Sequence, residues 1–222
     1  MLLAIDTCGN LGTVALAHLA SGDPEILGQT ELPGKTYSAQ LLPAIRDLLI
    51  HHNVTIARIA TIVVTNGPGS FTGIRIGLST AKGLAEPSAI PIVAVSRLAV
   101  LAHKAQNQNR EIQAAALDAS RHEFYFGDYS GPARAESLLT HDPFTQLATA
   151  LEPQLAICEE SLLATAPAAT LVPPPTAADA LLFALPRIRA RDFDDPVTLD
   201  GNYLRRSDAE IFSKAKLHPA QT

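Results

Sequence analysis

The stretch from Val63 to Gly77 constrains the fold most, because it joins an apolar strand to a helix through a Gly-Pro-Gly turn. The β-rich run from Ile59 to Val64 ends at this turn, and the helix follows at once. Backbone N–H groups at such a helix N-terminus can face an anion. The spacing matches neither a Walker A loop nor the G-x-G-x-x-G pattern, since Thr72 stands where a third glycine would be. We therefore favour a tight turn without a ligand over an anion site.

The helix after this turn carries a small residue at every fourth position: Gly73, Gly77 and Ala81. A glycine inside a helix costs about 1 kcal/mol relative to alanine, so two of them indicate that another element approaches this face closely. Ile74 and Leu78 lie beside the stripe. One side of the helix would cover its own sheet, and the glycine side would admit a second helix. That helix could belong to the same chain or to a partner subunit, and the periodicity leaves both open.

A short apolar strand, Leu2–Ile5, ends at Asp6 and Thr7, and the run Thr13–Leu19 returns as the second arm of a hairpin. Asp6 could face a metal–phosphate group, and Thr7 could donate to a phosphate. Alternatively, both side chains satisfy backbone N–H groups of the turn, as such residues commonly do. We favour the second interpretation.

The segment Gln113–Ala119 repeats this pattern, because it is an apolar strand that ends in Asp118 and a small residue. Glu123–Tyr129 then alternates as a returning strand. Each half therefore opens with a strand, an aspartate corner and a strand. This pattern predicts two related domains, over residues 1–102 and 103–222. The second is reduced, with a stretch rich in alanine, proline and threonine before its last helix.

An amphipathic helix, about Ser38–His52, lies between the first hairpin and the Gly-Pro-Gly turn, with Pro43 near its first turns. A strand over Ile90–Val95 follows the glycine-bearing helix, and Ser96 has the position of an N-cap for the next helix. The order β-β-β-α-β-α-β-α predicts an α/β fold in which helices pack on a mixed sheet. The apolar face of the first helix consists of Leu41, Leu42, Ile45, Leu48 and Leu49.

The charge of the chain restricts its partners. A formal net charge of −5 over 222 residues, without a basic stripe, argues against tight binding of nucleic acid by this chain alone. No apolar run reaches membrane-spanning length and the N-terminus lacks the features of a leader, so we expect a cytoplasmic protein without membrane contact. Cys8 and Cys158 lack metal-ligand spacing and are expected to be reduced thiols.

Several segments resemble one family, TsaB (also called YeaZ), in the same order and at similar spacing. The Gly-Pro-Gly-Ser-Phe-Thr-Gly-hydrophobic-Arg stretch is specific to that family and its close catalytic relatives. The resemblance covers nearly the whole chain. The matching segments are Leu3–Thr7, Gln40–Pro43, Gly67–Gly77, Ala94–Ser96, Leu117–Ala119 with Glu123–Tyr125, and Tyr203–Arg205.

The resemblance implies an actin-like (ASKHA) fold and a non-catalytic scaffold subunit. Such a subunit pairs with a TsaD-like catalytic subunit for N6-threonylcarbamoylation of adenosine 37 in tRNAs that read ANN codons. A TsaE-like ATPase joins them, and tRNA is bound only through the complex. The subunit alone forms a homodimer. The implied interface lies on the two first-domain helices, at Leu41, Leu42, Ile45, Leu48, Leu49, Gly73, Ile74, Gly77, Leu78 and Ala81.

The resemblance also implies what this chain lacks. TsaD-like subunits carry a His-x-x-x-His metal pair, which is absent from this sequence, so ATP, ADP and metal are expected on the partner subunits. Tyr37 stands where many members have histidine. Asp6, Thr7, Gly67 and Gly69 would be a vestigial phosphate site.

The alternative function is a stand-alone glycoprotease-like hydrolase or an ASKHA-type ATPase. A hydrolase needs an activated nucleophile with a base or a metal. Cys8, Ser70 and Ser120 have no base partner visible in the sequence. We therefore favour the scaffold over the enzyme and predict no catalytic residue in this chain.

Overall fold

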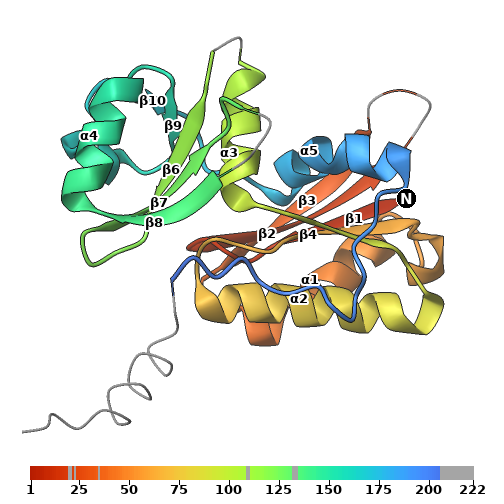
Figure 1. Ribbon diagram of the computed structural model, residues 1–222. Coiled ribbons are helices and arrows are strands. Elements are labelled where there is room, and N and C mark those ends of the chain that lie inside the picture. Colours follow the sequence, from red (N-terminus) through yellow and green to blue (C-terminus); the bar gives the residue numbers. More distant parts are fainter. Residues whose placement is uncertain (20–21, 23, 35, 109–110, 132–134, 206–222) are drawn as a thin grey trace, which may run out of the picture.

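The computed structural model describes residues 1–19, 22, 24–34, 36–108, 111–131 and 135–205. These residues form two five-stranded mixed sheets with helices on their faces (Figure 1). The strands are β1 (Leu2–Asp6), β2 (Leu11–His18), β3 (Glu25–Pro33), β4 (Thr61–Thr65), β5 (Ile92–Val95), β6 (Ala114–Asp118), β7 (Glu123–Asp128), β8 (Ala135–Thr140), β9 (Leu155–Ile157) and β10 (Thr170–Leu171). The helices are α1 (Tyr37–His51), α2 (Phe71–Ala85), α3 (Arg97–Gln106), α4 (His141–Leu151) and α5 (Ala177–Ala190), with short 3₁₀ turns η1 (Ile56–Arg58), η2 (Glu86–Ser88) and η3 (Glu160–Ala164).

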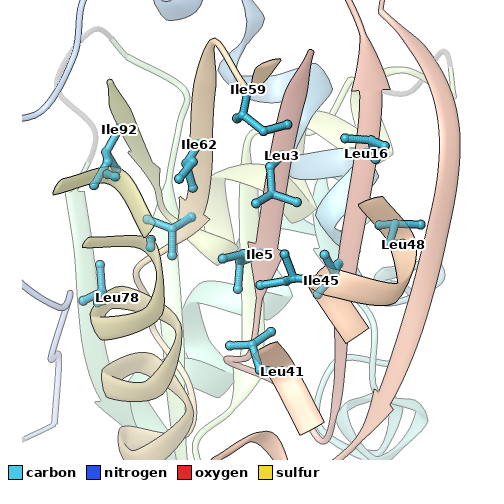
Figure 2. Packing of buried hydrophobic residues seen from close by; sticks show 14 of the residues in the cluster. Leu3, Ile5, Leu16, Leu41, Ile45, Leu48, Ile59, Ile62, Leu78 and Ile92 are labelled. Atoms are coloured by element: carbon cyan, nitrogen blue, oxygen red, sulfur yellow. The ribbon is translucent and has the colours of Figure 1, made fainter. Parts of the chain in front are cut away.

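The first sheet has the strand order β3-β2-β1-β4-β5. Strands β1, β2 and β3 are antiparallel, whereas β1, β4 and β5 are parallel. Every residue of β1 and β4 is buried, as expected where helices cover both faces of a sheet. On one face, α1 and α2 close a core in which Ile5, Ile45 and Leu78 are labelled in Figure 2. Helix α1 continues through Pro43.

The second sheet repeats the first. Its order, read as β8-β7-β6-β9-β10, corresponds strand by strand to β3-β2-β1-β4-β5. Strand β6 pairs antiparallel with β7 and parallel with β9, as β1 pairs with β2 and β4. Helix α4 stands where α1 stands in the first half, and the short η3 turn stands where α2 would be. The predicted internal repeat, the reduced second half and the actin-like α/β fold are therefore confirmed.

The last helix of each half packs on the sheet of the other half. Helix α3 follows β5 of the first sheet, yet Leu98 and Leu101 pack with Leu117 of the second sheet. Helix α5 follows β10 of the second sheet, yet Leu181 packs with Leu2 of the first sheet. Figure 1 shows α3 against the second sheet and α5 over the first. The two halves therefore contact each other through these helices, and the division at residue 102 stays a prediction.

After α5, the segment of residues 194–205, which we name the C-terminal strap, returns to the first sheet. The N–H of Asp194 donates to the Ile92 carbonyl oxygen at 2.9 Å, beside the edge strand β5. The N–H of Asn202 donates to the Asn66 carbonyl oxygen at 2.7 Å, just before the Gly-Pro-Gly turn. The C-terminal strap is therefore hydrogen-bonded to the residue just before the Gly-Pro-Gly turn.

The sequence predicts a final strand or an extended segment over residues 202–206, and fraying of the last residues, about 214–222. Up to Arg205 the chain forms no strand, because its first backbone donor bonds the turn rather than a sheet edge. Residues 206–222 lie outside the described residues.

Candidate functional site

The Gly-Pro-Gly turn requires both of its glycines. Gly67 has a φ of +114° and Gly69 a φ of +155°, a region that favours glycine. A Cβ on Gly67 would lie 2.8 Å from the Asn202 carbonyl oxygen, and one on Gly69 would collide with the Cys8 carbonyl. The turn is therefore closely packed between the strap and the first aspartate corner.

The first aspartate corner satisfies its own polar groups. Asp6 Oδ1 accepts the Cys8 N–H at 2.9 Å, which confirms the favoured interpretation for this residue. Thr7 bonds elsewhere: its buried hydroxyl donates to the Gly73 carbonyl oxygen at 2.7 Å. A vestigial phosphate site at Asp6, Thr7, Gly67 and Gly69 stays a prediction.

The glycine stripe faces this chain's own sheet, not a second helix. A Cβ on Gly77 would lie 2.5 Å from Thr7 Oγ1, and one on Gly73 would collide with the Thr7 carbonyl. The element that closely approaches Gly73 and Gly77 is thus the end of β1. The prediction that this side of α2 admits a second helix is wrong. Ile74 and Ala81 are 1% and 0% exposed. Leu78 is buried with them, so this row has almost no side-chain surface to offer a partner.

The outer surface of α1 is where apolar side chains remain exposed. Of the predicted interface residues on this helix, Leu41, Ile45, Leu48 and Leu49 are buried in the core, whereas Leu42 is 55% exposed.

Ile50, which the sequence analysis missed, is 65% exposed two turns after Leu42. The signal for it was the i, i+8 spacing from Leu42, which falls within one broad apolar face of an amphipathic helix.

An open groove of about 510 Å³ runs beside this stripe, between α1, η1 and the end of α2. Its walls are mainly apolar, and Leu84 of α2 faces the α1 side chains across it. The groove is lined by Leu42, Pro43, Ile45, Arg46, Leu49, Ile50, Val54, Ile56 and Leu84. Exposed apolar surface of this kind marks interaction sites more often than a monomer's ordinary surface does.

A second hollow, of about 580 Å³, lies where the N-termini of α1 and α2 meet. Tyr37 is buried in its wall and donates its hydroxyl to the Gly9 carbonyl oxygen at 2.8 Å. Burial raises the pKa of Tyr37 to about 12, so the phenol stays protonated near neutral pH. Ser70 caps α2 by accepting the Gly73 N–H at 3.2 Å. These groups support the local fold.

The two aspartate corners face each other across a third, smaller cavity of about 220 Å³. The second corner repeats the first: Asp118 Oδ1 accepts the Ser120 N–H at 2.7 Å. Arg97, at the start of α3, is buried in the cavity wall, and its Nε lies 3.5 Å from Asp6 Oδ2. Glu159, after β9, lies on the opposite half. The sequence analysis missed Arg97 and Glu159, because only the folded chain brings α3 and β9 to the corners.

Burial keeps the two cysteine thiols protonated. Cys8 and Cys158 are free, buried thiols. Burial raises the pKa of both, that of Cys158 to about 12, whereas reactive thiols have lowered pKa values. Among the described residues, no group of three or more His, Cys, Asp or Glu side chains could hold a metal ion. Within the same ranges, no helix is both long enough and apolar enough to cross a membrane.

The family model described as "TsaD: tRNA N6-adenosine threonylcarbamoyltransferase" matches residues 30–184. The tRNA threonylcarbamoyladenosine biosynthesis protein TsaB of Escherichia coli (strain K12) is 32% identical over 155 residues, which cover 69% of this chain and 63% of that protein. The protein of the same name from Bacillus subtilis (strain 168) is 38% identical over 128 residues, covering 58% and 54%. The alignments thus span little more than half of these relatives.

A solved structure, "YeaZ from Pseudomonas aeruginosa", superposes with a TM-score of 0.73 at 29% identity, covering 90% of this chain and 98% of that one. The match extends over both sheets, so it supports the duplicated architecture as a whole. Because the TsaD model matches well over half of the chain and the named relatives and this structure agree, the chain belongs to the TsaB (YeaZ) family within the wider TsaD family.

Proposed function

We propose that this chain is a non-catalytic scaffold subunit in the biosynthesis of threonylcarbamoyladenosine in tRNA. The observation that carries the proposal is the exposed apolar stripe and groove on α1 and α2, in a chain whose relatives are named for that biosynthesis. The partner is a TsaD-like catalytic subunit, which covers the groove. A TsaE-like ATPase joins the pair, and tRNA is bound through the complex, because this chain carries a net charge of −5.

Several observations support the absence of catalysis by the chain alone. The buried thiols are held protonated, and Ser70 serves as a helix cap. Asp6 is committed to the Cys8 N–H and to Arg97. A hydrolase or ATPase of this chain alone would need a nucleophile, base or metal that is not already engaged.

The experiment is to mix the chain with the TsaD-like subunit from the same source and to measure molar mass by size exclusion with light scattering. The proposal predicts that the chain alone is a homodimer through the α1–α2 groove and that a one-to-one species replaces it on mixing. Failure to associate, with or without ATP, would overturn the proposed partner. Turnover of ATP or peptide by the repurified chain alone would overturn the scaffold role.

A further inference from the structure

Two chemically labile dipeptides lie side by side where the C-terminal strap meets the Gly-Pro-Gly turn. The sequence has one Asn-Gly pair, which begins at Asn66, and one Asp-Gly pair, which begins at Asp200. The Asn66 side-chain Nδ2 donates to the Asp200 carbonyl oxygen at 3.4 Å. Glycine has no side chain to shield its backbone nitrogen. In both pairs this nitrogen can therefore attack the carbonyl carbon of the preceding side chain, a reaction that closes a five-membered succinimide ring.

The fold protects the Asn-Gly pair. The Asn66 N–H donates to the Val95 carbonyl oxygen at 3.0 Å, and the Asn66 carbonyl oxygen accepts the Asn202 N–H at 2.7 Å. Gly67 is buried, and its carbonyl oxygen accepts the Arg97 N–H at 2.7 Å. Ring closure requires the backbone between the two residues to rotate, and these hydrogen bonds hold it in place. We therefore expect Asn66 to stay intact while the chain is folded.

The Asp-Gly pair has the opposite arrangement. Asp200 is exposed, and the Gly201 N–H donates to Oδ1 of Asp200 at 2.7 Å. Because Oδ1 is bonded to the carboxyl carbon, the attacking nitrogen lies beside the carbon that it attacks. Packing also favours glycine at position 201, since a Cβ there would lie 2.6 Å from the Tyr203 ring and 2.8 Å from the buried Ile74 side chain. The fold thus retains the labile pair and exposes it.

We propose that Asp200 is a site of spontaneous isoaspartate formation in the folded chain, and that this modification releases the end of the C-terminal strap. The Gly201 nitrogen bonds to the Asp200 carboxyl carbon, and the carboxyl hydroxyl leaves with the N–H proton as water. Water then adds to the succinimide. Opening at the side-chain carbonyl restores aspartate, whereas opening at the backbone carbonyl gives isoaspartate. One water leaves and one enters, so no other reactant is needed.

Isoaspartate adds one carbon to the backbone, about 1.5 Å of chain, just before the residues that anchor the strap. Asn202 is the first of these anchors: its N–H donates to the Asn66 carbonyl oxygen at 2.7 Å, and its Nδ2 donates to Glu136 Oε2 at 2.5 Å. Next, the Tyr203 ring contacts Phe71, the first residue of α2, with 4.9 Å between centroids. The modification therefore displaces contacts with both the turn and α2. The inference goes beyond the scaffold role and does not depend on pairing with another subunit.

The test is peptide mapping of the full folded chain after incubation at neutral pH, with isoaspartate located by electron-transfer fragmentation. Trypsin cleaves after Arg191 and Arg205. The peptide between these sites holds both Asp200 and an internal control, Asp195. Asp195 is also exposed, but Pro196 follows it and has no N–H to lose. Isoaspartate should accumulate at Asp200 and not at Asp195. Its absence from Asp200 in the folded chain would overturn the proposal.

The Asn-Gly pair gives a second readout, which separates the effect of the fold from that of the dipeptide. Ammonia leaves more readily than hydroxide, so Asn66 should react before Asp200 when the chain is unfolded in urea. In the folded chain the order should invert, with isoaspartate at Asp200 and no deamidation at Asn66. Deamidation of Asn66 ahead of Asp200 in the folded chain would contradict the assignment.

Variants test the chemistry and its consequence. Asp200→Glu requires a six-membered ring, which closes far more slowly, so isoaspartate should be lost; Asp195→Glu is the matched control and should not change the yield at Asp200. Asp200→Asn forms the same succinimide faster and supplies the isoaspartyl chain in quantity. Hydrogen exchange of the Asn202 N–H should be faster after this conversion than before it. Equal exchange rates would show that the modification does not release the strap.

Discussion

At the scale of single residues, Thr7 determines how α2 packs on the first sheet. Its buried hydroxyl donates to the Gly73 carbonyl oxygen, and Gly73 and Gly77 bring the backbone of α2 against it. Periodicity in the sequence indicates such a close approach but has no direction, so it does not identify Thr7 as the neighbour.

Gly77→Ala should therefore destabilise the chain although alanine favours helices. The new Cβ would lie 2.5 Å from Thr7 Oγ1, and Thr7 is fully buried and bonded to Gly73, so it has no room to move. We expect a loss of about 1–3 kcal/mol in the free energy of unfolding by urea. Gly83→Ala, in the same helix with nothing near its Cβ, should instead gain about 0.4–1 kcal/mol. Equal effects at the two positions would contradict this packing.

The buried thiol of Cys158 makes stability depend on alkaline pH. Burial raises its pKa from the ordinary 9.0 to about 12, so the folded chain keeps a proton that the unfolded chain loses. This contribution is fully present below about pH 9 and is lost as the pH rises towards about 12. The free energy of unfolding should fall over that window, and less steeply in Cys158→Ala. Identical slopes for the two proteins would show that the thiol is not held protonated.

At the scale of elements, Glu136 on β8 joins three segments that are distant in sequence. Its Oε1 accepts the hydroxyls of Ser96, the N-cap of α3, at 2.5 Å and of Tyr129 at 2.7 Å. Its Oε2 accepts Asn202 Nδ2 of the C-terminal strap at 2.5 Å. The N-cap at Ser96 was predictable from local pattern, whereas its second partner was not, because nothing local relates β8 to α3.

Glu136→Ala should accordingly loosen the contact between the halves. Three donors lose their acceptor. Loss of this part-buried network should lower the free energy of unfolding, measured by heat or urea, by about 1–3 kcal/mol. Glu25→Ala, an exposed strand carboxylate on β3, is the control and should be near neutral. If the two variants unfold alike, Glu136 is not a structural link.

At the scale of the whole molecule, the exchange of α3 and α5 makes the two halves interdependent. Sequence patterns predicted helices α1, α2, α3 and α5 and the repeated unit of strand, aspartate corner and strand, because these depend on neighbours along the chain. They did not predict α4 or the strands β8, β9 and β10. They could not predict that α5 returns to the first sheet, because that depends on contacts such as Leu2 with Leu181, far apart in sequence.

A fragment of residues 1–102 should consequently not fold alone. Without α5, one face of the first sheet, including Leu2, Ala4 and Val63, would be exposed to water. We expect no cooperative unfolding transition by circular dichroism for this fragment, in contrast to the full chain. A cooperative transition for the fragment would show that the helix exchange is dispensable.

We propose that the exposed face of α1 binds the catalytic partner, and the Kd for the TsaD-like subunit, measured by calorimetry, tests this. Leu42→Asp places a charge in the apolar stripe and should cost about 2 kcal/mol or more, roughly thirtyfold in Kd. Leu147→Asp makes the same change on exposed α4 and should leave the Kd unchanged. Equal Kd values for Leu42→Asp and the parent would show that this face of α1 does not bind the partner.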